Sequence, residues 1–358
     1  MSDLASTRRG AAAFLENVAF SGLHEAVGSR DWAAKWRELG DTHFRRGDLS
    51  SAKGAIDEAR EAWLCALTAF EVARRLLDED DPGGEQVSAQ IELGVQRFGS
   101  ALQQKMERVQ ITSCWNQSEL PAYFLPASHA GLCCPAVICV SREQESAATL
   151  LGRVLPLSLG RAISILVVSH DDVSNQPPGA SKFFLSSCLD FLSVQDNVDP
   201  TRIGVYGEGL SAVIATDFAA EDTRVAAAVC DGGLWNWARR LASIGWMTRA
   251  AEVPNEQLAW ARRSQRVRQM KCPVLLVAGG RGVVSLSEAV SLQNDCADTR
   301  IDILTIPQTS IFRLGEIENF LASDDRIFRW LEHKLAKRMP PTGSDGQRSD
   351  TAMFRAGD

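Results

Sequence analysis

The sequence predicts an α/β protein, with a mostly parallel sheet covered by helices on both faces and an all-helical segment before it. From about Val109 onward, short and nearly continuous apolar runs alternate with amphipathic stretches of helical length. Such runs are typical of parallel strands that are buried on both faces. Before that point, apolar residues recur at three- and four-residue steps, the period of a helix. The expected strands are Pro135–Val140, Ile163–Ser169, Ile203–Gly207, Val225–Cys230, Pro273–Ala278 and Ile301–Ile306.

Three helices are expected before the sheet. The first runs over Asp31–Arg46 and stops at Gly47, and Ser50 or Ser51 caps a second that reaches about Leu77. That second helix carries alanines at near-helical spacing, and the turn-forming run 78–84 ends it. A third helix follows to about Lys105, and no proline occurs before Pro82 to interrupt this pattern.

The chain therefore divides into three parts. Residues 1–108 form an N-terminal helical cap region, residues 109–338 form the α/β core, and residues 339–358 form a disordered tail rich in turn residues. The last helix of the core is expected over about Ile317–Lys337. At 358 residues, this division agrees with a length too great for one ordinary domain.

Composition excludes several classes of function. The 38 basic and 45 acidic residues give a net charge of −7, so no broad electrostatic attraction to nucleic acid or to an anionic membrane is expected. No apolar run is long enough to span a bilayer and no signal peptide is found, so we expect a cytoplasmic protein. The nine cysteines are scattered without a CxxC pair, which predicts incidental thiols, no metal site and no cofactor.

A strand, a sharp turn and a helix are expected over Asp199–Ala212, which reads DPTRIGVYGEGLSA. This stretch resembles the nucleophile elbow of α/β-hydrolases, where such a strand leads into G-x-S-x-G. The order of elements resembles the family of FrsA-type esterases and 2,6-dihydroxypseudooxynicotine hydrolase over roughly residues 25–337. That family carries a helical segment with a pattern like the one from Asp31 to Ala52, with Trp32, Trp36, Gly40 and Gly47. The resemblance implies an α/β-hydrolase core with a helical cap.

The catalytic triad that the resemblance implies is absent from the sequence. Gly209 falls at the position of the nucleophile. No carboxylate occurs in the loop 279–284, where the acid is expected, and no histidine occurs in 307–313, where the base is expected. The five histidines are His24, His43, His129, His170 and His333. A conventional serine hydrolase activity is therefore not expected.

Ser211 is the one nearby hydroxyl that must be weighed as a substitute nucleophile. It lies two residues beyond the elbow position, about 200° around the helix axis at ~100° per residue, so its hydroxyl should turn away from the cleft. A packing role or a local hydrogen bond to the backbone is the simpler interpretation, and we expect no base beside it.

Polar residues that follow the expected strands are the candidates for a site, because ligands bind beyond the carboxyl ends of parallel strands. Glu208, Asp231 and His170 are the candidate catalytic groups, and burial of Glu208 is expected to raise its pKa. Each also has a structural interpretation: a carboxylate bonded near the turn, an Asx turn or cap, and a solvated loop. The candidate binding residues are Ser141, Arg142, Leu210, Ser211, Trp235, Trp237 and Arg281. The two tryptophans have packing between helix and core as their alternative, and Arg281 has a surface charge.

Three functions remain open. The first is a non-hydrolytic acid–base enzyme that cyclises, dehydrates or isomerises a small carbonyl, aromatic or polyketide-like compound. The second is a binding or regulatory pseudo-hydrolase, and the third is an ester or C–C hydrolase that uses an unrecognised nucleophile such as Ser211. In each case the expected partner is a small-molecule ligand in a cleft between cap and core, with a homodimer as one alternative for the assembly.

Overall fold

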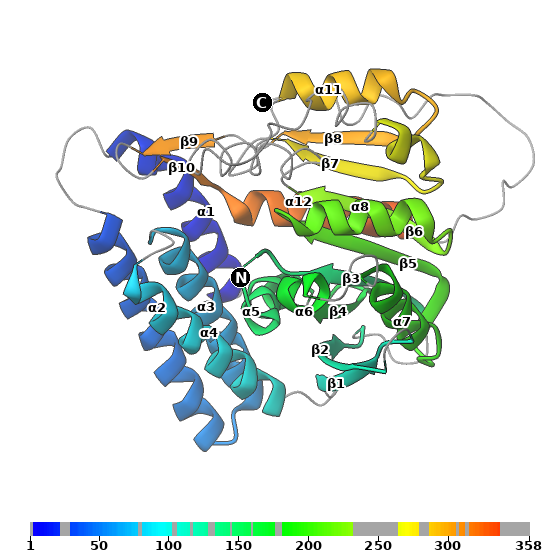
Figure 1. The fold of residues 1–358 in the computed structure, drawn as a ribbon. Coiled ribbons are helices and arrows are strands. Elements are labelled where there is room, and N and C mark those ends of the chain that lie inside the picture. Colours follow the sequence, from blue (N-terminus) through cyan, green and yellow to red (C-terminus); the bar gives the residue numbers. More distant parts are fainter. Residues whose placement is uncertain are drawn as a thin grey trace, which may run out of the picture.

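Eight strands form one sheet in the order β1-β2-β4-β3-β5-β6-β7-β8 (Figure 1). The computed structural model describes residues 3–21, 29–77, 81–101, 106–114, 117–127, 133–143, 145–158, 160–175, 181–231, 264–278, 286–305, 308–311 and 315–336. The strands of the sheet are β1 Glu107–Thr112, β2 Glu119–Leu125, β3 Cys134–Val140, β4 Ser164–Val168, β5 Val198–Glu208, β6 Val225–Asp231, β7 Val274–Ala278 and β8 Ile301–Thr305. All neighbours from β4 to β8 pair in parallel, while β2 is antiparallel to both β1 and β4.

All six strands expected from apolar runs are confirmed, and they make up the parallel part of the sheet. Every residue of β3, β4 and β7 is buried, whereas β8, at the edge of the sheet, has only Ile301 fully buried. The antiparallel strands β1 and β2 were not expected, because most of their residues are exposed or only partly buried and they lack a continuous apolar run. A separate two-stranded sheet of β9 Gln308–Ile311 and β10 Gly315–Glu318 was also not expected.

Helices cover both faces of the sheet and give a three-layer arrangement (Figure 1). One hydrophobic core joins the sheet to α7 Ser181–Ser193, α8 Ser211–Glu221 and α11 Leu286–Asp295. A second core joins the opposite face to α3 Ile56–Arg75, α4 Pro82–Ser100, α5 Ala147–Ser158 and α12 Phe320–Leu335. The remaining helices with described bounds are α1 Asp3–Ser21, α2 Ser29–Ala52 and α6 His170–Ser174. Helices from the N-terminal region thus supply part of the layer that covers the parallel sheet.

Two expected helix boundaries in the N-terminal region are wrong. The helix α2 does not stop at Gly47 but continues to Ala52, and Gly54, with φ at +77°, makes the turn instead. Gly47 serves close packing, because a Cβ there would lie 2.5 Å from the indole of Trp63 on α3. Ser50 and the residue after it belong to the end of α2, and α3 begins at Ile56 without a side-chain cap.

The boundaries of two later helices also differ from expectation. Pro82 does not lie in a terminating turn but is the first residue of α4, and the carboxylate of Asp81 caps this helix by accepting from the N–H of Gly83 at 2.9 Å. The last helix, α12, begins at Phe320 rather than near Ile317, because Ile317 pairs in β10 and Asn319 caps the helix. The expected tail, 339–358, lies outside the described residues.

The helix α4 ends at Ser100 and the first strand of the sheet, β1, starts at Glu107. Within the described part of the chain, no helix is both long and apolar enough to cross a bilayer.

Candidate functional site

A sharp turn joins β5 to α8 where the sequence predicts a nucleophile elbow. Gly209 at the centre of the turn has φ at +62°, a conformation that favours glycine. Its N–H donates to the carbonyl of Asp231 at the end of the neighbouring strand, at 2.9 Å. A Cβ on Gly207 would overlap the backbone of Ser211, so the first helical turn packs directly on the strand. The elbow is therefore present in backbone form, with glycine at its centre.

The carboxylate of Glu143 fills the space beside Gly209. A Cβ built on Gly209 would lie only 2.5 Å from Glu143 Oε2, and the same oxygen accepts a hydrogen bond from the N–H of Leu210 at 3.0 Å. Glu143 follows β3 in the chain and reaches the elbow from the neighbouring strand. The N–H of Leu210 was expected to survive as a backbone donor, and it is bonded to this carboxylate.

Arg142 also lies against the elbow, since its Cγ would be 3.2 Å from a Cβ on Gly209. Arg142, Glu143, Gly209 and Leu210 are all partly exposed. These four residues thus keep some exposed surface beside the elbow, whereas Glu208, Asp231 and Tyr206 are buried.

Glu208 is held between two arginines that come from different helices. Its Oε2 lies 2.6 Å from Arg153 on α5, and its Oε1 lies 3.3 Å from Arg75 on α3. Burial alone favours the protonated form, but the two guanidinium groups outweigh it and hold the pKa of Glu208 well below its ordinary value. The expectation that burial makes Glu208 a proton donor or acceptor near neutral pH is therefore wrong.

Asp231 and Glu208 are neighbours in register on β6 and β5. The hydroxyl of Tyr206 lies 3.3 Å from a carboxylate oxygen of each residue, and it accepts from Arg153 at 2.9 Å. Burial, ahead of the nearby charges, keeps the pKa of Tyr206 well above its ordinary value, so this hydroxyl remains a donor. Both carboxylates thus belong to a buried polar network.

Ion pairs connect this buried polar network to α3, one of the N-terminal helices. Glu71 on α3 pairs with Arg74 and Arg75 on the same helix at 2.7 and 2.8 Å. Arg74 also pairs with Glu145, which follows β3, at 2.8 Å. We refer to Glu71, Arg74, Arg75, Glu145, Arg153, Tyr206, Glu208 and Asp231 as the buried charge network. Because it spans α3, α5 and two strands, it fixes the helices beside the elbow.

His170 is the first residue of α6, and its imidazole contacts the first turn of α8, the helix that follows the elbow. Its Nδ1 lies 2.7 Å from Ser211 Oγ, and Ser211 Oγ in turn donates to the carbonyl of Ser141 at 2.6 Å. Ser211 and Ser141 have no exposed surface. The hydroxyl of Ser211 thus bonds to the backbone, as expected, and the imidazole beside it was not expected.

The elbow brings together all seven candidates that lie among the described residues, namely Glu208, Asp231, His170, Ser141, Arg142, Leu210 and Ser211. Trp235, Trp237 and Arg281 lie outside the described residues, so their proposed place in the cleft stays a prediction. The position of Glu143 after the expected strand Pro135–Val140 placed it at this end of the sheet, but its contact with Gly209 was not predicted. The available signal was Gly209 itself, because a glycine at the elbow centre leaves room for a side chain from another loop.

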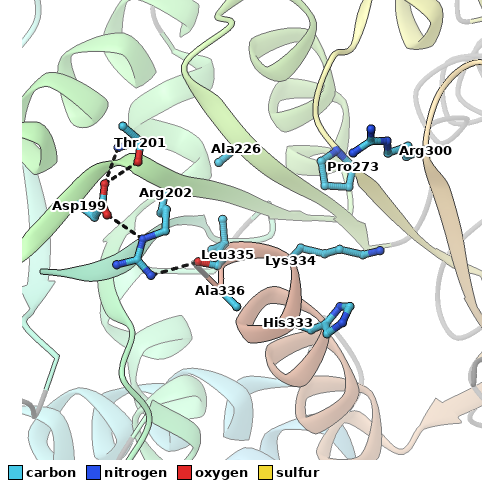
Figure 2. Close-up of a pocket in the computed structure, with 10 residues that line it drawn as sticks. All are labelled: Asp199, Thr201, Arg202, Ala226, Pro273, Arg300, His333, Lys334, Leu335 and Ala336. Atoms are coloured by element: carbon cyan, nitrogen blue, oxygen red, sulfur yellow. Dashed lines mark hydrogen bonds and ion pairs between the residues drawn. The ribbon is translucent and has the colours of Figure 1, made fainter. Parts of the chain in front are cut away.

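A cavity of about 700 Å³ lies at the opposite end of the sheet (Figure 2). It is lined by the amino ends of the strands, and Asp199 there is separated from Glu208 by nearly the whole of β5, roughly 25–30 Å at ~3.3 Å per residue. Arg202 in this cavity already bonds Asp199 and the carbonyl of Leu335, and Lys334 pairs with Asp302. This cavity is therefore distinct from the elbow.

Solved structures with a similar fold include hydrolases. The chain is similar to a 2,6-dihydroxy-pseudo-oxynicotine hydrolase, with a TM-score of 0.61 and 18% identity over 91% of this chain and 95% of that one. It is also similar to a puromycin-hydrolyzing peptidase of Mycobacterium tuberculosis, with a TM-score of 0.51 and 16% identity over 65% of this chain and 40% of that one. No protein-family profile and no curated protein matches the sequence. The chain has the α/β-hydrolase fold, as predicted, and likeness at these identities establishes fold alone.

A serine restored at the elbow should not restore hydrolysis. In Gly209→Ser, the new Cβ would collide with Glu143 Oε2 and adopt a strained φ, so we expect the free energy of unfolding to fall by about 1–3 kcal/mol. Neither this variant nor the wild type should react with a fluorophosphonate probe, as measured by intact-protein mass spectrometry. Stoichiometric labelling of the wild type at Ser211 would contradict this assignment of the elbow.

Proposed function

We propose that this protein is a non-hydrolytic enzyme of the α/β-hydrolase fold that uses Glu143 as a general base at the elbow. The substrate class is a small carbonyl, aromatic or polyketide-like compound, and the reaction is a proton-transfer chemistry such as cyclisation, dehydration or isomerisation. The observation that carries the proposal is the 2.5 Å between Glu143 Oε2 and the position of a Cβ on residue 209. A carboxylate occupies the place from which an elbow nucleophile would act.

A carboxylate beside the elbow can act as a general base in place of a nucleophile. A general base needs a lone pair within hydrogen-bond reach of the proton it removes, and it needs no covalent intermediate. The N–H of Leu210 holds one carboxylate oxygen in place at 3.0 Å, at the first turn of α8. Glu143 is partly exposed, so a substrate can approach it, whereas Glu208 is enclosed by Arg75 and Arg153. These contacts support Glu143, rather than Glu208, as the base.

Hydrolysis through Ser211 is less well supported by the contacts. A nucleophilic serine gives its proton to a base, but the hydroxyl of Ser211 donates to the carbonyl of Ser141 and is fully buried. A binding or regulatory pseudo-hydrolase remains the second candidate, because a partly exposed elbow could bind a ligand without turning it over.

The cytoplasm is the proposed location. All nine cysteines are free thiols, seven of them buried, which agrees with a reducing compartment.

Ring opening of 5-nitrobenzisoxazole tests the proposal, because this reaction needs only a base near an apolar surface. We expect the wild type to accelerate the reaction over buffer, and Glu143→Gln to lose that acceleration by on the order of 10² or more, since the amide cannot accept the proton. Release of the phenolate product is measured by absorbance.

The matched control is Glu107→Gln, which removes an exposed carboxylate at the start of β1 and should leave the rate unchanged. Equal rates for wild type and Glu143→Gln, or no acceleration by the wild type, would overturn the proposed role of Glu143. Circular dichroism of each variant confirms that the fold is retained.

A further inference from the structure

The hydrogen bonds around Ser211 fix the position of the proton on His170. Ser211 Oγ carries a single hydrogen, and its 2.6 Å contact to the carbonyl of Ser141 uses that hydrogen, because a carbonyl can only accept. The 2.7 Å contact between the same Oγ and His170 Nδ1 must therefore be a bond in which Nδ1 donates. Neutral His170 then carries its proton on Nδ1 and a lone pair on Nε2.

Ser141 forms hydrogen bonds with both His170 and Ser211. Its Oγ accepts from the backbone N–H of His170 at 3.0 Å and donates to the carbonyl of Glu145 at 2.6 Å, while its own carbonyl accepts from Ser211. The side chains of Ser141 and Ser211 have no exposed surface, so water does not compete for these bonds. The orientation of the imidazole is thus set by buried groups of β3, α6 and α8.

His170 lies close to the proposed base. The N–H of Leu210 donates to Glu143, and the next residue, Ser211, contacts the imidazole of His170 through its Oγ. Burial lowers the pKa of His170, with Glu143 and Asp171 acting in the opposite direction, so the imidazole is neutral at pH 7. With Nδ1 bonded to a buried serine, Nε2 is the ring nitrogen left for a ligand.

We propose that His170 is a second proton-transfer group of this site, acting through Nε2, and that Ser211 is the positioning residue that fixes its tautomer. The inference rests on the proposed function of Glu143 and narrows the substrate to a carbonyl compound that also carries a hydroxyl group. With the hydroxyl on the carbon next to the carbonyl, Glu143 removes the proton of that carbon and delivers it to the carbonyl carbon, while Nε2 accepts the O–H proton and gives it to the carbonyl oxygen, so that the hydroxyl and carbonyl groups exchange places and both side chains regain their starting protonation. No additional reactant is needed, because the proton count on His170 is restored.

The tautomer is measured by ¹⁵N NMR of histidine-labelled protein, with the His170 signals assigned from their loss in His170→Gln. We expect neutral His170 of the wild type to show a protonated Nδ1 and an unprotonated Nε2. In Ser211→Ala the acceptor for Nδ1–H is removed, so a substantial share of His170 should move its proton to Nε2. Ser211→Thr keeps the hydroxyl and should retain the wild-type signals.

Carbethoxylation with diethyl pyrocarbonate provides a second measurement, because this reagent attacks an unprotonated imidazole nitrogen. Peptide mapping should find His170 modified in the wild type and modified several-fold more slowly in Ser211→Ala. The matched control is Thr216→Ala, which removes another buried hydroxyl of α8, one that donates to the carbonyl of Ala212, and should change neither signal.

A wild-type His170 protonated on Nε2, or a His170 that stays unmodified, would overturn this inference. Neither measurement uses a substrate, so such a failure would leave the proposal for Glu143 intact. Conversely, failure of the 5-nitrobenzisoxazole test would remove Glu143 as base without altering the tautomer result.

Discussion

Replacement of Glu208 by glutamine should lower the free energy of unfolding by about 3–5 kcal/mol, the range expected when one partner of a buried ion pair is removed. The change leaves the guanidinium groups of Arg153 and Arg75 without the carboxylate that lies 2.6 and 3.3 Å from them. Arg153 has 2% of its side chain exposed, so water cannot replace the lost partner. Urea denaturation at pH 7 measures the difference.

A surface carboxylate provides the comparison. Glu221→Gln removes the carboxylate of two exposed ion pairs, with Lys182 and with Arg266, and each such pair contributes at most about 1 kcal/mol. If Glu208→Gln were as stable as Glu221→Gln, the contacts with the two arginines would not contribute to stability. Glu208 would then return as a candidate for acid–base chemistry.

The strands of the core could be predicted because each one is a continuous apolar run between turn residues. The helix boundaries were less predictable, since the signals that suggest a stop also serve other purposes. Gly47 appeared to end a helix, yet it lies mid-helix because the ring of Trp63 packs against it. Pro82 likewise begins a helix, because its missing N–H costs nothing in the first turn.

The site was predictable where it depends on residues adjacent in sequence, and not where it depends on contacts between distant ones. The sharp turn between β5 and α8, with a glycine at its centre, follows from the local sequence around Gly209. The pKa of Glu208 does not, because Arg75 is 133 residues away in the chain and nothing local indicates that it points at the elbow. The contact of Glu143 with the elbow and the contact between His170 and Ser211 could not be predicted for the same reason, because each joins loops that follow different strands.

The N-terminal helices therefore do more than cover one face of the sheet. Arg75 of α3 forms an ion pair with Glu208, immediately before the elbow, and Arg74 forms one with Glu145. The backbone carbonyl of Glu145 accepts a hydrogen bond from the hydroxyl of Ser141. The same segment of α3 thus contacts both the end of β5 before the elbow and the loop that carries Glu143. Loss of this helix should disturb the elbow as well as the hydrophobic core.

Acidification should remove several kcal/mol of stability, and Glu71 should account for a large part of the loss. Burial alone would raise the pKa of Glu71, but Arg74 and Arg75 outweigh it and lower the pKa from 4.5 to about 2. A carboxyl group with a depressed folded-state pKa stabilises the fold above its unfolded-state pKa, near 4.5, and loses that effect as pH falls toward 2. A drop of this size corresponds to about 3 kcal/mol.

The variant Glu71→Gln separates this contribution from those of other carboxylates. At pH 7 it should be less stable than the wild type by about 3–5 kcal/mol, because the guanidinium groups of Arg74 and Arg75 lose a buried partner. Between pH 5 and pH 2 its stability should fall less steeply, since it has no proton to take up at residue 71. Glu38→Gln, at an exposed position of α2, should keep the wild-type slope. Equal slopes for Glu71→Gln and the wild type, measured by urea denaturation at each pH, would mean that Glu71 titrates alike in the folded and unfolded chains, and the buried charge network would then not be what makes the fold acid-sensitive.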